Sequence, residues 1–329
     1  MIWRSREGNR YMKHIFIINP YAGTIDYSER IRKILNRKEN FEYLVFDTEY
    51  KGHETELAER MCELFADEYI RFYACGGSGT FVNILNGIQD FEKTEIAFFP
   101  CGLSSDFAKC FGSDQVHFHN INKLIDGEPM YMDILEFGKH RAINSFSVGV
   151  DALVARDVDK FRLFAYLRNG VSYKIAGVKN FMLSRAKYYE VEVDGKRYDG
   201  KYTLIYIGNG ICYGGKYFPL DNADPSDGEV ELVMVRNMRL FEIFKLLGYY
   251  EEGNREEMKQ FAQIVKGSEF RIKIKGKKEM LCAFDGEVLE EMEVAGSVCA
   301  RKLRMIVPKG VTIKKAKHVK EGMGCGAKS

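Results

Sequence analysis

The sequence predicts an α/β domain with a parallel sheet, followed by an all-β domain built as an antiparallel sandwich. From residue 14 to 111, short apolar runs alternate with glycine-containing turns and with segments whose apolar residues recur three and four apart. After about residue 130 the pattern changes to alternating apolar and polar residues joined by tight turns. The chain has 329 residues, 46% of them apolar, which is enough for two domains with cores. This composition excludes a disordered or collagen-like chain.

Four apolar runs predict the strands of the first domain: HIFIIN (14–19), FEYLVF (41–46), IRFYAC (70–75) and EIAFF (95–99). The segments between them have helical spacing, as in Phe81, Ile84, Leu85 and Ile88. Parallel neighbours need a crossover connection, which a helix commonly supplies. We therefore expect a three-layer α/β domain in which helices cover both faces of a parallel sheet.

The second domain is predicted from four alternating segments: YYEVEVDGKRY (188–198), GEVELVMV (228–235), EFRIKIKGKKEMLCAFDGEVLE (269–290) and RKLRMIV (301–307). The Asp-Gly pair in the first of them is typical of a tight hairpin turn. Two further segments, 157–186 and 239–264, have the spacing of helices. We expect an antiparallel β-sandwich interrupted by these two helical segments.

The charge of the chain is unevenly distributed. The 49 Lys and Arg residues against 47 Asp and Glu residues give a formal charge of +2, yet residues 301–329 carry +8 and residues 1–300 carry −6. The pattern changes at GEPMY (127–131), which we take as the domain boundary. The expected organisation is a tail at 1–12, an α/β domain at 13–130, a sandwich domain at 131–310 and a basic tail at 311–329.

Hydropathy and cysteine usage predict a cytoplasmic protein. The apolar runs at 15–18, 96–99 and 204–207 are far shorter than the roughly 18 apolar residues of a membrane span, so we expect no transmembrane segment. No apolar signal-peptide core follows the arginines of the first eleven residues. The eight cysteines form no CxxC pair, which favours reduced thiols over a disulfide scaffold.

Glycine-rich turns follow three of the predicted strands. They are NPYAG (19–23), CGGSGT (75–80) and PCGLSSDF (100–107). In parallel α/β sheets, ligands bind beyond the carboxyl ends of the strands, and glycines allow the backbone to approach a phosphate closely. A helix that begins at such a turn adds partial positive charge. One such turn is more often only a turn, but three at the same sheet edge favour a phosphate-binding site.

These residues resemble the diacylglycerol kinase catalytic domain family, which contains soluble bacterial lipid kinases and is related to sphingosine, ceramide and, more distantly, NAD kinases. The resemblance covers about 13–310. The motifs in the first half are NPYAG, DTEYKGHETELA (47–58), GGSGTFVNILNG (76–87) and PCGLSSDFAK (100–109). Those in the second half are GNGICYGGKYF (208–218), DNADPSDGEVEL (221–232) and AFDGEVLE (283–290).

The resemblance implies ATP-dependent transfer of a phosphoryl group to a lipid hydroxyl, most simply that of diacylglycerol. It implies an α/β domain that binds the nucleotide with Mg²⁺ and a sandwich domain that binds the lipid. The positions expected around the nucleotide are Asn19, Gly23, Thr48, Gly76, Gly77, Ser78, Gly79, Thr80 and Gly102.

Two acidic motifs of the second half also match the family. Asp285 matches its proposed general base and Glu287 stands beside it, although Asp285-Gly286 also has the composition of a hairpin turn. Asp224, Asp227 and the backbone of Glu229 match a structural Mg²⁺ site, and oxygen ligands suit this ion. The alternative for that segment is an Asp-Pro turn with solvated acids.

The chain departs from the family on the nucleotide side. Ser78 replaces the acid of the family's GGDGT motif, and Leu103 and Ser105 replace a Thr and an Asn. The loss of a carboxylate near Mg²⁺ leaves a catalytically impaired lipid or nucleotide binder as one alternative, and an NAD kinase as another. As partners we expect an anionic membrane surface contacted by the basic tail, and no nucleic acid. A homodimer remains open.

Overall fold

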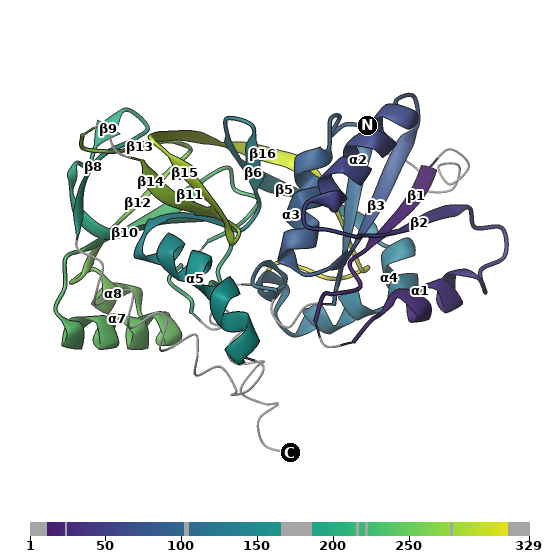
Figure 1. The fold of residues 1–329 in the computed structure, drawn as a ribbon, viewed down its shortest axis with the longest axis horizontal. Coiled ribbons are helices and arrows are strands. Elements are labelled where there is room, and N and C mark those ends of the chain that lie inside the picture. Colours follow the sequence, from purple (N-terminus) through teal and green to yellow (C-terminus); the bar gives the residue numbers. More distant parts are fainter. Residues whose placement is uncertain are drawn as a thin grey trace, which may run out of the picture. The chain divides into compact units, whose positions relative to one another are not determined.

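The computed structural model divides the chain into two compact units (Figure 1). Its described residues are 12–23, 25–101, 105–165, 186–214, 217–220, 223–276 and 279–314, without the side chains of 158–165 and 240. The first unit contains residues up to Met132 together with Arg301–Lys314, and the second contains Asp133–Ala300. The chain therefore passes from one unit to the other at 132/133 and returns at 300/301.

The first unit is built on a parallel sheet, as predicted. The strands lie in the order β16-β4-β3-β1-β2, and every neighbouring pair is parallel. Their bounds are β1 Met12–Ile18, β2 Tyr43–Asp47, β3 Tyr69–Gly76, β4 Thr94–Pro100 and β16 Glu293–Val307, of which residues 301–307 belong to this unit. The helices are α1 Ser28–Leu35, α2 His53–Leu64, α3 Ser78–Gly87, the 3₁₀ segment η2 Phe107–His119, and α4 Ile121–Ile125.

Alternate residues of β4 show that both faces of this sheet are covered. The ring of Phe98 lies 5.3 Å from that of Phe81 on α3. The ring of Phe99, on the other face, lies 5.7 Å from Tyr27 beside α1 and 6.1 Å from His119. Because successive side chains of a strand point to opposite faces, the sheet forms the middle of three layers.

An ion-pair cluster fixes the last strand to the first unit. Glu95 on β4 lies between Arg71 on β3 and Arg304 on β16, each directly opposite it in register. The Glu95 carboxylate accepts a 2.8 Å bond from Arg71 Nε and a second bond from Arg304, while its side chain is 3% exposed. A buried carboxylate is stable only when it is paired. The predicted strand at 301–307 therefore forms, but within the α/β unit rather than within a sandwich domain that runs to 310.

Residues 311–314 do not begin a free tail. Val311 is buried, the backbone N–H of Lys314 donates to the Cys110 carbonyl at 2.6 Å, and Lys314 Nζ lies 3.3 Å from an Asp114 carboxylate oxygen. Lys314, which the expected basic tail at 311–329 includes, is therefore held by residues of the first unit. Residues 315–329, the rest of the predicted basic tail, lie outside the described residues.

The second unit is an antiparallel sandwich. One layer has the strand order β15-β14-β7-β10-β11-β12, and the other runs from the start of β10 through β8 and β13 to β16. Their bounds are β5 Glu128–Phe137, β6 His140–Ala142, β7 Ser145–Gly149, β8 Lys187–Val193, β9 Lys196–Arg197, β10 Gly200–Gly208, β11 Val230–Arg236, β12 Ala262–Gly267, β13 Glu269–Ile274, β14 Met280–Phe284 and β15 Glu287–Glu291.

Four phenylalanines fill the centre of the sandwich. Phe137 lies with its ring centroid 4.7 Å from Phe146, 5.2 Å from Phe270 and 4.8 Å from Phe284. Phe146 and Phe284 come from one layer and Phe270 from the other, so the cluster joins the two layers. All four are buried, which removes a large apolar area from water.

The helical segments of this unit differ from the predicted ranges. Helix α5 begins at Val150 rather than 157 and is described to Ala165, so most of the predicted 157–186 segment lies outside the described residues. The predicted segment 239–264 contains α7 Leu240–Glu252 and α8 Arg255–Met258. The helical part of this segment ends at Met258, before the predicted end at 264, because residues 262–267 pair with β11 as strand β12. Among the described residues, no helix is long and apolar enough to cross a membrane.

Candidate functional site

In the first unit, backbone hydrogen bonds connect the residues that directly follow the parallel strands to the carboxyl ends of the neighbouring strands. The N–H of Asn19 donates to the Cys75 carbonyl at 2.9 Å, and the N–H of Thr48 donates to the Ile18 carbonyl at 2.8 Å. The N–H of Cys101 donates to the Gly76 carbonyl at 2.8 Å. The turns that carry the predicted nucleotide residues therefore start side by side at one edge of the sheet.

The loop from Gly76 to Thr80 joins β3 to the first turn of α3. A Cβ on Gly76 would lie 2.6 Å from Cβ of Thr80, so glycine is required there by close packing. By contrast, a Cβ on Gly77 or Gly79 would meet no atom within 4 Å. These two glycines and Ser78 are partly exposed, and Gly77 as N-cap residue offers no side chain to the helix amides. The open backbone and the first N–H groups of the helix are suited to bind a phosphate group.

A buried carboxylate that sequence reasoning missed organises this loop. Glu54, in the first turn of α2, is 3% exposed. Its Oε1 accepts bonds from Asn19 Nδ2 and Thr80 Oγ1, both at 3.3 Å, and its Oε2 accepts from Asn83 Nδ2 at 3.2 Å. Asn19 Nδ2 also lies 3.4 Å from Thr80 Oγ1. Glu54 thus connects two of the predicted nucleotide residues, and only its position in the DTEYKGHETELA motif pointed to it.

The remaining predicted residues of the nucleotide side are spread around this edge. Gly23 has a φ of 79°, the left-handed conformation that glycine adopts without strain. Thr48 is buried. Ser105 has a buried hydroxyl without a hydrogen-bond partner among the described residues. Gly102 and Leu103 lie outside the described residues.

In the second unit, Asp285 and Gly286 form the turn of the hairpin between β14 and β15. Both have positive φ, 45° and 93°, as a two-residue hairpin turn requires. The Asp285 carboxylate accepts hydrogen bonds from the backbone N–H groups of residues 143, 144 and 145, at 2.7 to 3.2 Å. Glu287 is the first residue of β15. The aspartate therefore fastens the β6–β7 loop to the hairpin.

The same loop is connected to the glycine-rich segment after β10. Asn144 accepts at its carbonyl from the N–H groups of Asn209 and Gly210, at 2.9 and 3.2 Å, and its Nδ2 donates to the Cys212 carbonyl at 3.1 Å. Asn209 Nδ2 donates to the carbonyls of residues 133 and 143. Three turns, two of them carrying family motifs, thus converge on Asp285. Sequence reasoning missed Asn144 and Asn209, whose side-chain oxygens are buried without a partner among the described residues.

Another buried carboxylate, that of Asp151, lies in the first turn of α5. Asp151 accepts a hydrogen bond from the hydroxyl of Ser147, and burial raises the pKa of Asp151 to about 6 against the lowering effect of that bond. Burial also raises the pKa of Tyr250, and the Asp151 charge adds to this rise. Asp151 therefore titrates closer to neutrality than an ordinary aspartate. The apolar run around it gave no sign of this from sequence.

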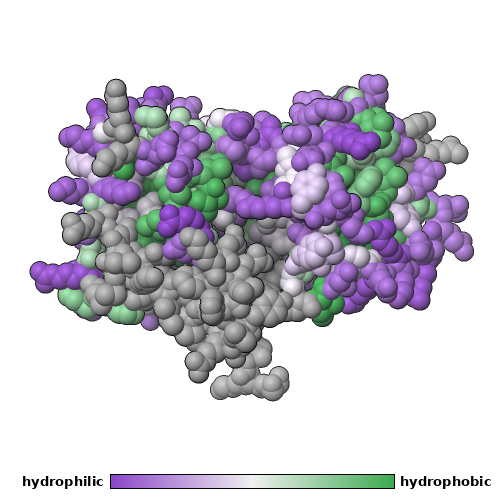
Figure 2. Space-filling model, viewed as in Figure 1, coloured by the Kyte–Doolittle hydropathy of each residue, from purple (hydrophilic) through white to green (hydrophobic). Residues whose placement is uncertain are grey.

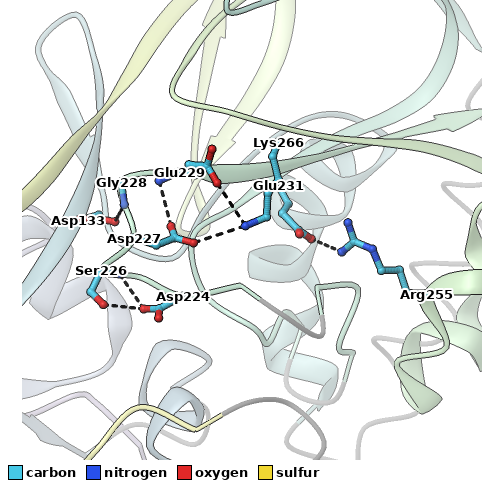
Figure 3. A network of polar contacts seen from close by, with 9 residues as sticks. All are labelled: Asp133, Asp224, Ser226, Asp227, Gly228, Glu229, Glu231, Arg255 and Lys266. Carbon is cyan, nitrogen blue, oxygen red and sulfur yellow. Dashed lines mark hydrogen bonds and ion pairs between the residues drawn. The ribbon is translucent and has the colours of Figure 1, made fainter.

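The predicted Mg²⁺ loop is occupied by internal hydrogen bonds and a lysine (Figure 3). Asp224 Oδ1 accepts from the N–H and hydroxyl of Ser226, at 3.0 and 2.6 Å. Asp227 Oδ1 accepts from the N–H of Glu229 at 3.0 Å, and Lys266 Nζ lies 3.4 Å from both Asp227 Oδ2 and Glu229 Oε2. The described residues contain no group of three or more His, Cys, Asp or Glu that could hold a metal ion.

Each of the two units matches a known protein family. Residues 13–137 match the family described as diacylglycerol kinase catalytic domain. Residues 144–307 match the family described as YegS C-terminal NAD kinase beta sandwich-like domain. The first unit thus resembles a diacylglycerol kinase catalytic domain, and the second resembles the sandwich domain of the other family. The resemblance inferred from the motifs, and the fold class of parallel α/β unit plus antiparallel sandwich, are confirmed.

Individual relatives agree with this assignment. A Staphylococcus carnosus (strain TM300) protein named "Putative lipid kinase" is 22% identical over 72% of this chain and 77% of its own length. A Staphylococcus aureus (strain MRSA252) protein named "Putative lipid kinase SAR0780" is 20% identical over 91% of this chain and 98% of its own. A crystal structure titled as a diacylglycerol kinase from Bacillus anthracis str. Sterne superposes with a TM-score of 0.71 at 19% identity, covering 92% of this chain and 99% of that one.

Proposed function

We propose that this protein is an ATP-dependent lipid kinase, which transfers the γ-phosphoryl group to the hydroxyl of diacylglycerol or a related lipid. The observation that carries the proposal is the glycine loop at the start of α3. Gly77 and Gly79 leave space in front of the backbone, Gly76 packs against Thr80, and Glu54 holds Asn19 and Thr80 in place. Phosphoryl transfer depends mainly on positioning and on neutralisation of charge, which such a loop can supply.

The nucleotide side fits ATP, with Asn19, Gly23, Thr48, Gly76, Gly77, Ser78, Gly79, Thr80 and Gly102 as the proposed contacting residues. We propose that the triphosphate is bound by the loop amides and by the positive end of α3. Because Ser78 supplies a hydroxyl in place of a carboxylate, the Mg²⁺ required for transfer would be held mostly by the phosphates and water. This chain should consequently need a higher Mg²⁺ concentration than a relative with an acid at that position.

On the acceptor side, we keep Asp285 as the proposed general base, with Glu287 beside it, and assign Asp285 a second role. Its carboxylate already accepts from three backbone N–H groups, so it also holds the β6–β7 loop. Asp194 provides a matched control, since it too occupies an Asp-Gly turn with positive φ and accepts from the N–H groups of Ser268 and Glu269. Both Asp→Asn variants should lower stability, by about 1 to 3 kcal/mol each. Only Asp285→Asn should lower the kcat of lipid phosphorylation, by about 100-fold or more.

The decisive experiment is transfer of labelled phosphate from Mg-ATP to a panel of acceptors presented in mixed micelles. The panel contains diacylglycerol, ceramide, a sphingoid base and NAD, so that the NAD kinase alternative is tested in the same assay. We expect label in one lipid and none in NAD. Label in NAD alone would overturn the lipid proposal. Equal rate losses for Asp285→Asn and Asp194→Asn would remove the base role and leave Asp285 as an anchor.

A non-catalytic nucleotide binder is the second candidate, favoured by Ser78 and by the hydrogen bonds that already occupy Asp285. It predicts that ATP binds, as measured by isothermal titration calorimetry, although no acceptor in the panel is labelled. Restoration of turnover by Ser78→Asp would then identify the natural chain as an impaired kinase.

We further propose that the protein works at an anionic membrane surface. Phe241 and Phe244 on α7 are 55% and 54% exposed, one helical turn apart, and hydrophobic colour is visible on the surface near α7 in Figure 2. Aromatic side chains of this kind insert into the headgroup boundary of a bilayer. Phe241→Ser with Phe244→Ser should weaken binding to vesicles containing 30% anionic lipid by about tenfold. Leu64→Ser, at a site that is 64% exposed on the first unit, is the control. Equal binding by all three proteins would contradict the role of α7.

Removal of 315–329, the basic part of the proposed tail, should weaken vesicle binding mainly at low salt, because its attraction to anionic lipid is electrostatic. An unchanged affinity at low salt would exclude a role for this tail. Sedimentation of the same samples without vesicles tests whether the protein is a homodimer.

A further inference from the structure

Lys266 occupies the centre of the acidic loop at 224–229. Its Nζ lies 3.4 Å from one carboxylate oxygen of Asp227 and 3.4 Å from one of Glu229 (Figure 3). Lys266 sits on β12, directly opposite Glu231 on β11. Glu231 forms an ion pair with Arg255. The ammonium group of Lys266 instead forms its ion pairs with the acids of the loop.

Two further carboxylate oxygens of the loop accept hydrogen bonds from within the loop. Asp224 Oδ1 closes a turn on Ser226, and Asp227 Oδ1 accepts from the N–H of Glu229. The loop is also fastened to Asp133, which is fully buried. Its Oδ2 accepts from the N–H of Gly228 at 2.7 Å, and its own N–H donates to the Pro225 carbonyl at 2.7 Å.

The donor set therefore does not fit the divalent cation that the family resemblance implies. Mg²⁺ requires near-octahedral oxygens at about 2.0 to 2.1 Å, and Ca²⁺ takes six to eight oxygens at about 2.3 to 2.6 Å. Here two carboxylate oxygens face an ammonium group, which offers three N–H donors and one positive charge. A lysine in this position supplies one positive charge to the two carboxylates without any bound ion.

We propose that the ammonium group of Lys266 takes the place of a structural divalent cation in this chain, so that the 224–229 loop is held without metal. The charge it supplies is covalently part of the protein and is always present. The same geometry predicts what its removal would do. Without Lys266, Asp227 and Glu229 would lose the ion-pair partner that they share among the described residues, and oxygen ligands of this kind attract a divalent cation.

The test compares the melting temperature of the full chain in 1 mM EDTA with that in 10 mM MgCl₂ or CaCl₂, without nucleotide. Three proteins are used: wild type, Lys266→Met and Lys273→Met. Lys273 is a matched control because it is 49% exposed, against 40% for Lys266, and pairs with Glu293 on a neighbouring strand. We expect Lys266→Met to melt a few degrees lower in EDTA and to regain about 2 to 4 °C with the cation. Wild type and Lys273→Met should change by less than about 1 °C.

Two results would overturn the proposal. A rise in the wild-type melting temperature with Mg²⁺ or Ca²⁺ that Asp227→Asn abolishes would mean that the loop binds metal despite the lysine. A Lys266→Met protein that gains no response to either cation would mean that the ammonium group does not stand in a cation's place. Lys266→Arg, which keeps the charge, should remain unresponsive, and a cation response in that variant would equally contradict the argument.

Discussion

A buried histidine should make the first unit sensitive to mild acid. His14 on β1 is 4% exposed, its Nδ1 lies 2.8 Å from the Tyr73 hydroxyl, and its ring centroid lies 4.5 Å from that of Phe41. Burial, together with the positive charges of Arg71 and Lys38, lowers the pKa of His14 from 6.5 to about 3. The folded unit therefore keeps this imidazole neutral at a pH at which the unfolded chain is protonated.

The sign and size of the effect follow from proton linkage. Between pH 6.5 and 3 the unfolded state binds more protons at this position, so stability is fully present above pH 6.5 and falls as the pH is lowered. With these two pKa values, the loss of unfolding free energy at pH 5 is about 2 kcal/mol, or about 30-fold in the opening equilibrium.

Hydrogen exchange of the β1 amides at pH 7 and pH 5, corrected for intrinsic rates, measures this loss within the first unit. We expect the wild-type opening constant to rise about 30-fold more than that of His14→Gln, which cannot be protonated but keeps a hydrogen-bonding group for Tyr73. His53→Gln removes a histidine at the start of α2 and should behave like wild type. If His14→Gln and wild type respond to pH equally, the argument that burial of His14 causes acid sensitivity is refuted.

Three further predictions concern the first unit. Gly76→Ala should destabilise it by about 1 to 3 kcal/mol in urea unfolding, because the new Cβ would collide with Thr80, and an unchanged midpoint would contradict the packing argument. Glu95→Gln should lower the free energy of unfolding by about 3 kcal/mol in the same assay, because it leaves Arg71 and Arg304 without their carboxylate partner. A loss below about 1 kcal/mol would mean that the cluster contributes no more than an exposed ion pair does. Glu54→Gln should cost about 2 kcal/mol and weaken ATP binding measured by calorimetry, and a lower stability with unchanged affinity would show that Glu54 does not position the loop.

The sequence predicted the parts of the fold that depend on local pattern. The four strands of the first unit, the final strand at 301–307 and the Asp-Gly turn at 194–195 all follow from period, composition and turn chemistry. The prediction of a helical segment at 239–264 was wrong at its C-terminal end. Residues 262–264 have helical spacing, but their pairing with β11 outweighs this local preference.

The side-chain networks could not be predicted in this way, because their members are far apart in sequence. Glu54 meets Asn83 only after α2 and α3 pack together, and Lys266 faces Asp227 only because of the register between β11 and β12. The composition of Asp285-Gly286 allowed the hairpin turn that the structure shows, while the role of Asp285 as general base, which the motif favoured, stays a prediction. That its carboxylate would hold the backbone of residues 143–145 required the folded sandwich.

The chain leaves the first unit at 132/133 and returns to it at 300/301, and this determines the order in which the two units can be completed during synthesis. The described part of the second unit is one continuous segment, Asp133–Ala300, whereas the first unit needs residues 301–307 to cover the edge of β4 and to supply Arg304. Until those residues leave the ribosome, β4 has an open edge and Glu95 lacks one of its two guanidinium partners. The unit that begins first is therefore finished last, and a nascent chain stopped before residue 301 would contain the strands of the sandwich and an unfinished first unit.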